Sequence, residues 1–113
     1  MKESELVKSA LVWLKKQPGK YFRINSGVIF IPAKPKPRMI RLAPAGTSDI
    51  LGVLPNGRFI ALEAKVGTNK ATPKQLEFLA EVIRNGGHGL VFYSLKELKD
   101  YWKGGWKNEN HLA

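Results

Sequence analysis

Three charged residues in the middle of the chain, Asp49, Glu63 and Lys65, have types and a spacing that could support catalysis. They fall in the stretch from Gly46 to Lys65, whose apolar runs predict two strands joined by a tight turn. Because successive side chains of a strand point to opposite faces, Glu63 and Lys65 project from the same face. Carboxylates are oxygen ligands for Mg²⁺ or Mn²⁺, and such an ion beside a lysine could assist hydrolysis of a phosphodiester bond.

The turn between the two strands decides whether Asp49 shares that face. A two-residue loop on Asn56 and Gly57 would place Asp49 on the opposite face from Glu63. A three-residue loop, with Pro55 in the first central position of a type I turn and Gly57 in a left-handed bulge, places Asp49 directly opposite Glu63. The fixed negative φ of proline favours the three-residue loop. Two opposed carboxylates repel each other unless a cation lies between them.

The neighbouring groups extend this hypothesis. The main-chain oxygen of Ala64 lies between the two functional side chains and could add a metal ligand. Lys65 could orient the attacking water or neutralise charge in the transition state. The alternative is an exposed hairpin on which Glu63 and Lys65 are ordinary surface charges, since a glutamate and a lysine two residues apart often occur by chance.

The elements around the hairpin must position these groups. Residues 3–16 predict an amphipathic helix in which Glu3 lies at the inward edge of the apolar stripe and Glu5 points outward. Glu3 is therefore the better candidate for a further carboxylate ligand, although an acid in the first turn also complements the helix dipole. Gln75 begins a second predicted helix as the partner of Thr72 in a capping box, which gives it a complete structural explanation.

The remaining elements complete an α/β architecture. Residues 21–25 and 28–31 predict strands, residues 39–42 predict the return strand of a protruding ribbon, and residues 89–93 predict a buried strand. Ser94 and Glu97 open a short helix that runs through Trp102. A crossover helix between strands 58–66 and 89–93 implies a parallel pair, and the hairpin implies an antiparallel one. We therefore predict a single domain over 1–113, a mixed sheet with helices packed on it, and a flexible or interface tail over 103–113.

Charge indicates the partner. The 113 residues carry a formal charge of +10, with 19 basic and 9 acidic residues, which favours nucleic acid over an anionic membrane or an acidic protein. The proline-rich segment 32–38 and its flanking strands would form a stiff basic projection suited to the phosphate backbone. The alternative is a solvated loop whose charge is incidental. The predicted DNA contacts are Arg23, Asn25, Lys34, Lys36, Arg38, Arg41, Lys70 and Lys74.

Composition excludes several other classes. No apolar run approaches the roughly 20 residues that cross a bilayer, and the first residues lack the apolar stretch of a signal peptide. The absence of cysteine excludes thiol catalysis, disulfides and cysteine-bound zinc. We expect a protein of the cytoplasm, associated with the nucleoid.

The spacing of Asp49, Glu63 and Lys65, followed by a helix that opens with a glutamine, resembles the PD-(D/E)xK nuclease superfamily. The chain is most similar to the VRR-NUC family, whose members have a restriction-endonuclease-like fold with an α-β-β-β-α-β core. The resemblance covers nearly the whole chain through ESELVKSALVWL, FRINSG, GTSDILGV, FIALEAK, ATPKQLEFL and GGHGLVFYS.

The resemblance implies roles for individual residues. It implies that Glu3, Asp49 and Glu63 bind Mg²⁺ or Mn²⁺ together with the Ala64 main-chain oxygen. It further implies that Lys65 is the catalytic lysine, and that Gln75 is the glutamine following the core motif. The chain departs from the family at Ser48, where a proline is usual, and at Val7, where a glutamine often stands. The second departure leaves Glu5 as a substitute for Glu3.

The resemblance also implies a substrate and an assembly. Stand-alone domains of this family are similar to Holliday junction resolvases, which implies a homodimeric endonuclease acting on branched, four-way DNA in replication, recombination or repair. A helicase or replication protein is a further possible partner. Two alternatives remain: a non-catalytic DNA-binding module with the nuclease fold, and a basic RNA-binding protein.

Overall fold

The computed structural model describes residues 1–24 and 28–104. The elements follow the chain in this order: α1 (Glu3–Leu14), β1 (Lys20–Arg23), β2 (Val28–Ile31), β3 (Arg38–Arg41), β4 (Ile50–Val53), β5 (Phe59–Ala64), α2 (Pro73–Arg84), β6 (His88–Phe92) and α3 (Leu95–Gly104). With β2 and β3 set aside, α1 to β6 form the predicted α-β-β-β-α-β core, so the predicted fold class is confirmed.

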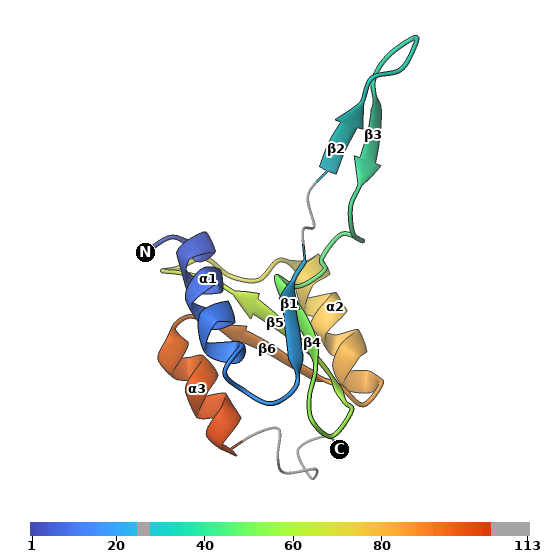
Figure 1. Ribbon diagram of the computed structural model, residues 1–113. Coiled ribbons are helices and arrows are strands. Elements are labelled where there is room, and N and C mark those ends of the chain that lie inside the picture. Colours follow the sequence, from blue (N-terminus) through green and yellow to red (C-terminus); the bar gives the residue numbers. More distant parts are fainter. Residues whose placement is uncertain (25–27, 105–113) are drawn as a thin grey trace.

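Four strands form the central sheet in the order β1-β4-β5-β6. Strand β4 is antiparallel to both β1 and β5, whereas β6 runs parallel to β5 as the crossover through α2 requires. Helices α1 and α3 lie on one side of the sheet and α2 on the other (Figure 1). The result is a mixed sheet between two helical layers, with β5 in its interior.

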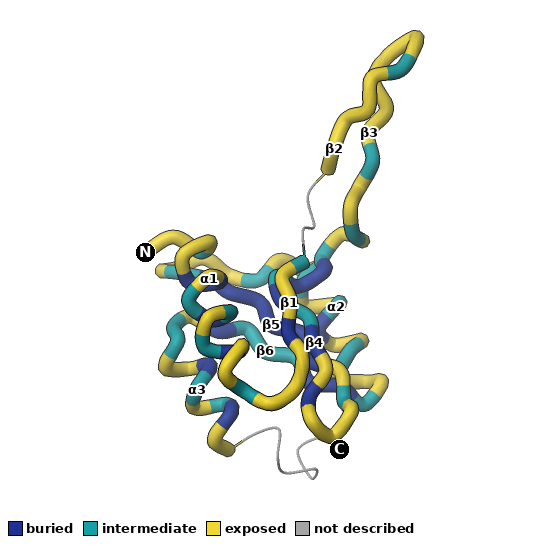
Figure 2. Tube along the Cα trace, in the orientation of Figure 1, coloured by how far each residue is buried: buried dark blue, intermediate teal, exposed yellow. Residues whose placement is uncertain are grey.

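The alternation of β5 assigns its side chains to the two faces. Ile60, Leu62 and Ala64 are fully buried in the main core with the apolar stripe of α1. Glu63 is also buried, but it points to the opposite face, toward the layer of α2. Figure 2 shows β5 as buried over most of its length, and only its first residue, Phe59, is exposed. Burial is unusual for a strand segment that carries a carboxylate.

The hairpin between β4 and β5 has the register predicted from Pro55. The Leu54 amide donates to the Arg58 carbonyl at 2.9 Å, and Gly57 has a φ of +85°. Ile50 then pairs with Leu62, so the residues just before and just after them, Asp49 and Glu63, face each other. No non-glycine residue in the described ranges has a positive φ, which excludes the two-residue type I′ turn at Asn56.

The route into β4 depends on Gly46. Its φ is +87°, and a Cβ there would collide with the main-chain carbonyl of Lys74 at the start of α2. Only glycine accommodates both the backbone conformation and the close approach. The close approach of Gly46 to Lys74 therefore places the chain that enters β4 beside the start of α2.

Strands β2 and β3 form a separate two-stranded ribbon that projects away from the sheet and its helices (Figure 1). Val28 pairs with Arg41 and Ile31 with Arg38, which confirms the predicted return strand. Every residue of the two strands except Ile40 is exposed (Figure 2). We call residues 28–41 the ribbon.

The C-terminal part differs from prediction in where its helix ends. Helix α3 extends to Gly104, so Lys103 and Gly104 are helical rather than part of the predicted tail, and 105–113 lie outside the described residues. Trp102, in the last turn of α3, is only 5% exposed and packs edge-on against Trp13 and Tyr21. It is a core residue because α3 packs beside α1. Within the described ranges, none of the helices has the length and apolarity needed to cross a bilayer.

Candidate active site

Asp49 and Glu63 meet where β4 begins and β5 ends. Asp49 lies just before β4, and its Oδ2 accepts a hydrogen bond of 2.9 Å from the Ala64 amide. That bond fixes the Asp49 carboxylate next to the main chain of β5, beside the Glu63 side chain. Glu63 itself is only 2% exposed. The strand register therefore holds two carboxylates together with little solvent between them.

The environment of Glu63 strongly disfavours its charge. Burial and then the adjacent Asp49 carboxylate raise the pKa of Glu63 from 4.5 to about 8, against the opposing effect of Lys65. Its Oε1 atom is buried and receives no hydrogen bond from any residue the structure describes. An ionised carboxylate with an unsatisfied oxygen beside a second carboxylate is costly, and either a proton on Glu63 or a bound cation would relieve that cost.

Lys65 supplies the only nearby positive charge among the described residues that contact Glu63. Its Nζ lies 3.9 Å from Glu63 Oε2 and 3.9 Å from Glu3 Oε1, and the residue is 8% exposed. At this distance the ammonium offsets part of the negative charge without a short hydrogen bond to either carboxylate. The ammonium therefore stays available to a further group in the site.

Gln75 has two roles at once. Its side-chain Oε1 accepts a hydrogen bond from the Thr72 main-chain amide at 2.8 Å. The Gln75 main-chain amide donates to Thr72 Oγ1, which completes the capping box of α2. Its Nε2 donates to Glu63 Oε2 at 3.2 Å. The predicted cap and the observed contact with Glu63 are compatible, because the two ends of one side-chain amide serve different partners.

Of the two acids in α1, Glu3 is the one near Lys65. Its Oε2 accepts a hydrogen bond of 3.1 Å from Asn69, in the loop after β5. Glu5 instead accepts from the Lys2 amide at the exposed helix start. Sequence reasoning did not single out Asn69, which is also held by the Tyr93 hydroxyl on its carbonyl. A polar residue in a loop gives no local signal of such contacts.

The predicted set of three carboxylate ligands is not assembled in this structure. Among the residues the structure describes, no three His, Asp or Glu side chains gather closely enough to surround one metal ion. Asp49 and Glu63 are adjacent, whereas Glu3 is engaged with Lys65 and Asn69. Two carboxylates and a main-chain oxygen nevertheless suit Mg²⁺, which usually retains several waters and takes one or two protein carboxylates. The Asp49–Glu63 pair with the unsatisfied Glu63 oxygen therefore fits such an ion.

The predicted DNA contacts lie in two exposed regions. Lys34, Lys36, Arg38 and Arg41 are on the ribbon, while Lys70 and Lys74 flank the loop that leads from the site into α2. Arg23 ends β1 and is exposed. Asn25 lies outside the described residues. No residue in the chain between Glu5 and Asp49 is acidic, so the ribbon and the segments on either side of it are uniformly basic or neutral.

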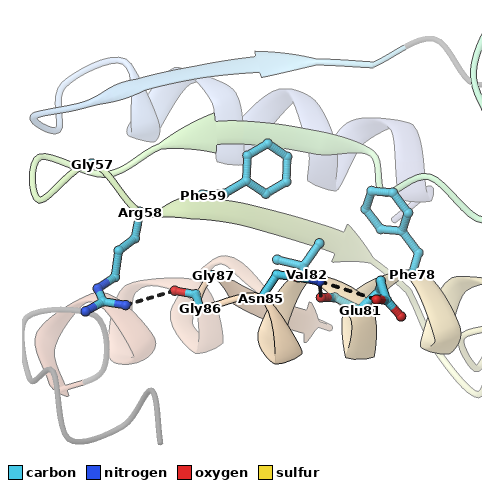
Figure 3. A pocket seen from close by; sticks show the side chains of 9 residues that line it. All are labelled: Gly57, Arg58, Phe59, Phe78, Glu81, Val82, Asn85, Gly86 and Gly87. Atoms are coloured by element: carbon cyan, nitrogen blue, oxygen red, sulfur yellow. Dashed lines mark hydrogen bonds between the residues drawn. The ribbon is translucent and has the colours of Figure 1, made fainter.

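A hollow of about 590 Å³ lies at the other end of β5 from Glu63 (Figure 3). Arg58 donates across its rim to the Gly86 carbonyl at 3.1 Å, and Phe59, Phe78 and Val82 line it. Its one acid, Glu81, is paired with Arg84 at 2.7 Å. This hollow therefore has no pair of carboxylates and lies apart from Asp49 and Glu63.

Comparison with known proteins identifies the fold. No protein-family model matches the sequence, and a comparison with curated proteins found no significant match. A solved structure described as a "VRR_NUC domain" matches over 92% of this chain and 97% of that chain, with a TM-score of 0.64 and 19% sequence identity. The class of fold is therefore the mixed sheet and helices of the VRR_NUC domain, as the sequence predicted. At this identity the similarity shows the fold alone.

Proposed function

We propose that this chain is a DNA endonuclease that depends on Mg²⁺ or Mn²⁺ and hydrolyses phosphodiester bonds. The observation that carries the proposal is the buried Glu63 carboxylate, which lies beside Asp49 with one oxygen unsatisfied within the described structure. A protein that only bound a polyanion would not benefit from acids at this position. A metal ion would make use of them.

Each residue of the site has a role in this proposal. Asp49, Glu63 and the main-chain oxygen of Ala64 would hold the ion. The bound ion would polarise a phosphoryl oxygen and lower the pKa of a water. Lys65 would place its ammonium on that water or on the developing negative charge.

Two further residues would act on this set indirectly. Glu3 would hold Lys65 through the ion pair between them. Gln75 would fix the orientation of the Glu63 carboxylate by its hydrogen bond. Ligation of the metal by Glu3 itself stays a prediction, because Glu3 is paired with Lys65 and Asn69 here.

The proposed substrate is branched DNA such as a four-way junction, cleaved by a homodimer in replication, recombination or repair. The basic ribbon projects away from the sheet and its helices (Figure 1), which supports contact with DNA beyond the scissile strand. A helicase or replication partner and a location in the cytoplasm or nucleoid belong to the same proposal.

Cleavage of labelled four-way, flapped and linear duplexes, with Mg²⁺, Mn²⁺ or EDTA, tests this function. The expected result is cleavage with either metal and none with EDTA. Glu63→Gln should abolish it, whereas Glu77→Gln, an exposed acid on α2, should not. Cleavage that survives EDTA or the Glu63 substitution would exclude the mechanism. Salt-sensitive binding without turnover in any metal would instead support the non-catalytic DNA-binding module.

A further inference from the structure

The ribbon has a property that binding to phosphates does not explain. Its strands carry large apolar side chains that are exposed to solvent: Phe30 is 65% exposed and Met39 is 59% exposed. An isolated two-stranded hairpin is only marginally stable in water, and exposed apolar clusters mark interaction sites. Lysine and arginine alone would suffice for electrostatic contact with DNA, so the apolar residues require a separate account.

The register places the most exposed apolar pair on one face. Phe30 is directly opposite Met39, so their side chains are cross-strand neighbours. Ile29 and Ile31 alternate to the other face. The two faces of the ribbon can therefore be altered independently, with substitutions of similar chemistry in the same strand.

Phe30 and Met39 also line a concave surface. They form an open hollow of about 720 Å³ at the tip of the ribbon, whose remaining walls are two prolines and three cations. These walls are Lys34, Pro35, Lys36, Pro37 and Arg38. An aromatic ring, a thioether and prolines beside several cations and no acid form a surface that accepts a flat apolar group bearing negative charge.

We infer that this hollow binds an unpaired nucleotide of the DNA, with the base against Phe30 and Met39 and its phosphates on Lys34, Lys36 and Arg38. Aromatic side chains stack on bases whose faces are not covered by neighbours, and basic side chains hold the backbone beside them. Phenylalanine, methionine and proline are also among the residues that enter DNA between base steps. A branch or a bulge presents such bases, whereas a continuous duplex does not.

Charge favours DNA over a second copy of this chain as the occupant. A second ribbon brought against the hollow would add its own four cations to the same place, and like charges brought together are destabilising. DNA brings one phosphate for each nucleotide. The inference rests on the proposed function only in that both take DNA as the ligand, and it does not depend on cleavage.

Binding in EDTA isolates the inference from catalysis. Fluorescence anisotropy would measure affinity for a duplex with a single-stranded bulge and for the same duplex fully paired, over a range of salt concentrations. The Phe30→Ala/Met39→Ala variant should lose roughly tenfold to a hundredfold in affinity for the bulged duplex. Its affinity for the paired duplex, and its dependence on salt, should stay unchanged.

Two control variants complete the test. Ile29→Ala/Ile31→Ala removes apolar side chains from the other face and should leave the preference for the bulge intact. Lys34→Ala/Lys36→Ala should weaken binding to both duplexes and reduce the slope of log K against log salt by up to about 1.8. Sedimentation of each variant without DNA would report any change in oligomeric state.

The possible outcomes separate the inference from the proposed function. Equal loss from both apolar variants, or no loss from either, would overturn the nucleotide site even if the wild-type protein cleaves DNA. Dissociation of an oligomer by the Phe30 and Met39 substitutions would overturn it in favour of an interface between protein chains. Absence of any DNA binding by the wild-type protein would overturn both proposals. Cleavage lost on Glu63→Gln with the preference for the bulge retained would support both.

Discussion

The carboxylate site and the ribbon differ in charge, burial and packing. Asp49 and Glu63 lie at the end of the central sheet, where buried strands and the start of α2 hold them within hydrogen-bonding distance of fixed partners. The ribbon is exposed on both faces, and its cations make no ion pair within the described structure under the usual distance limit. The first region holds its charges in fixed positions, whereas the second presents its charges to solvent.

The difference indicates how such a small chain could divide its functions. Catalysis requires groups fixed before the substrate arrives, and that is possible only where the core supports them. Recognition of a branched polyanion requires reach and a favourable field, which an extended basic element provides. Substitutions in the two regions should therefore change different quantities, and each prediction below tests that separation.

The largest effect is expected at Lys65. Lys65→Ala should lower the single-turnover cleavage rate at least about a hundredfold, because it removes the charge nearest the carboxylates. Binding of DNA in EDTA should change little. Lys8→Ala, which removes an exposed lysine of α1, is the matched control. A Lys65 variant that loses binding but retains its rate at saturating DNA would show that the two regions are not separate.

The ribbon cations should show the opposite behaviour. Lys34→Ala/Lys36→Ala should raise KM by about tenfold relative to the wild type at low salt and leave kcat unchanged. Each lost phosphate contact lowers both the affinity and its dependence on salt, so the difference from the wild type should be smaller at moderate salt. The measurement is a steady-state titration at two salt concentrations. A fall in kcat of similar size would indicate that the ribbon helps to assemble the site.

The unusual pKa of Glu63 predicts a dependence of stability on pH. The pKa of this carboxyl group has its ordinary value of 4.5 in the unfolded chain and is about 8 in the folded chain. Between these values the folded state binds more protons, so the free energy of unfolding should fall as pH rises and level off above about 8. Thermal melts of the metal-free protein would measure this decline against Glu63→Gln, in which it should be much smaller. Equal decline in both proteins would contradict the environment described for Glu63.

The smallest effect separates the two roles of Gln75. Thr72→Ala and Gln75→Ala should each cost about 1 kcal/mol of stability by breaking the capping box of α2. Only Gln75→Ala also removes the hydrogen bond to Glu63, so it alone should reduce cleavage at a temperature where both variants are folded. Equal activity in the two variants would show that Gln75 acts only as a cap of α2.

The sequence predicted the features that follow from local chemistry. Pro55 and Gly57 indicated the strand register that places Asp49 opposite Glu63. Thr72 and Gln75 marked the start of α2. The contacts that join distant segments were less accessible. The capping box does not predict that the Gln75 side-chain amide reaches Glu63, and the hydrogen bond of Asn69 to Glu3 had no local signal.

Burial was the least predictable property. The run Val28–Ile31 has the composition of a buried strand, yet it is exposed because it pairs only with β3. Trp102 could belong to a core or an interface on composition alone, and the packing of α3 beside α1 decided for the core. The metal ligands Glu3, Asp49 and Glu63, and the choice of Mg²⁺ or Mn²⁺, stay predictions.

A crystal structure of the protein soaked with Mn²⁺ tests the central claim most directly, because anomalous scattering locates the ion without reference to activity. The account predicts one strong peak within ligand distance of the Asp49 and Glu63 carboxylates and the Ala64 main-chain oxygen, and none in Glu63→Gln. An occupied manganese site elsewhere, with Glu63 still unpaired in a protein that cleaves DNA, would contradict it.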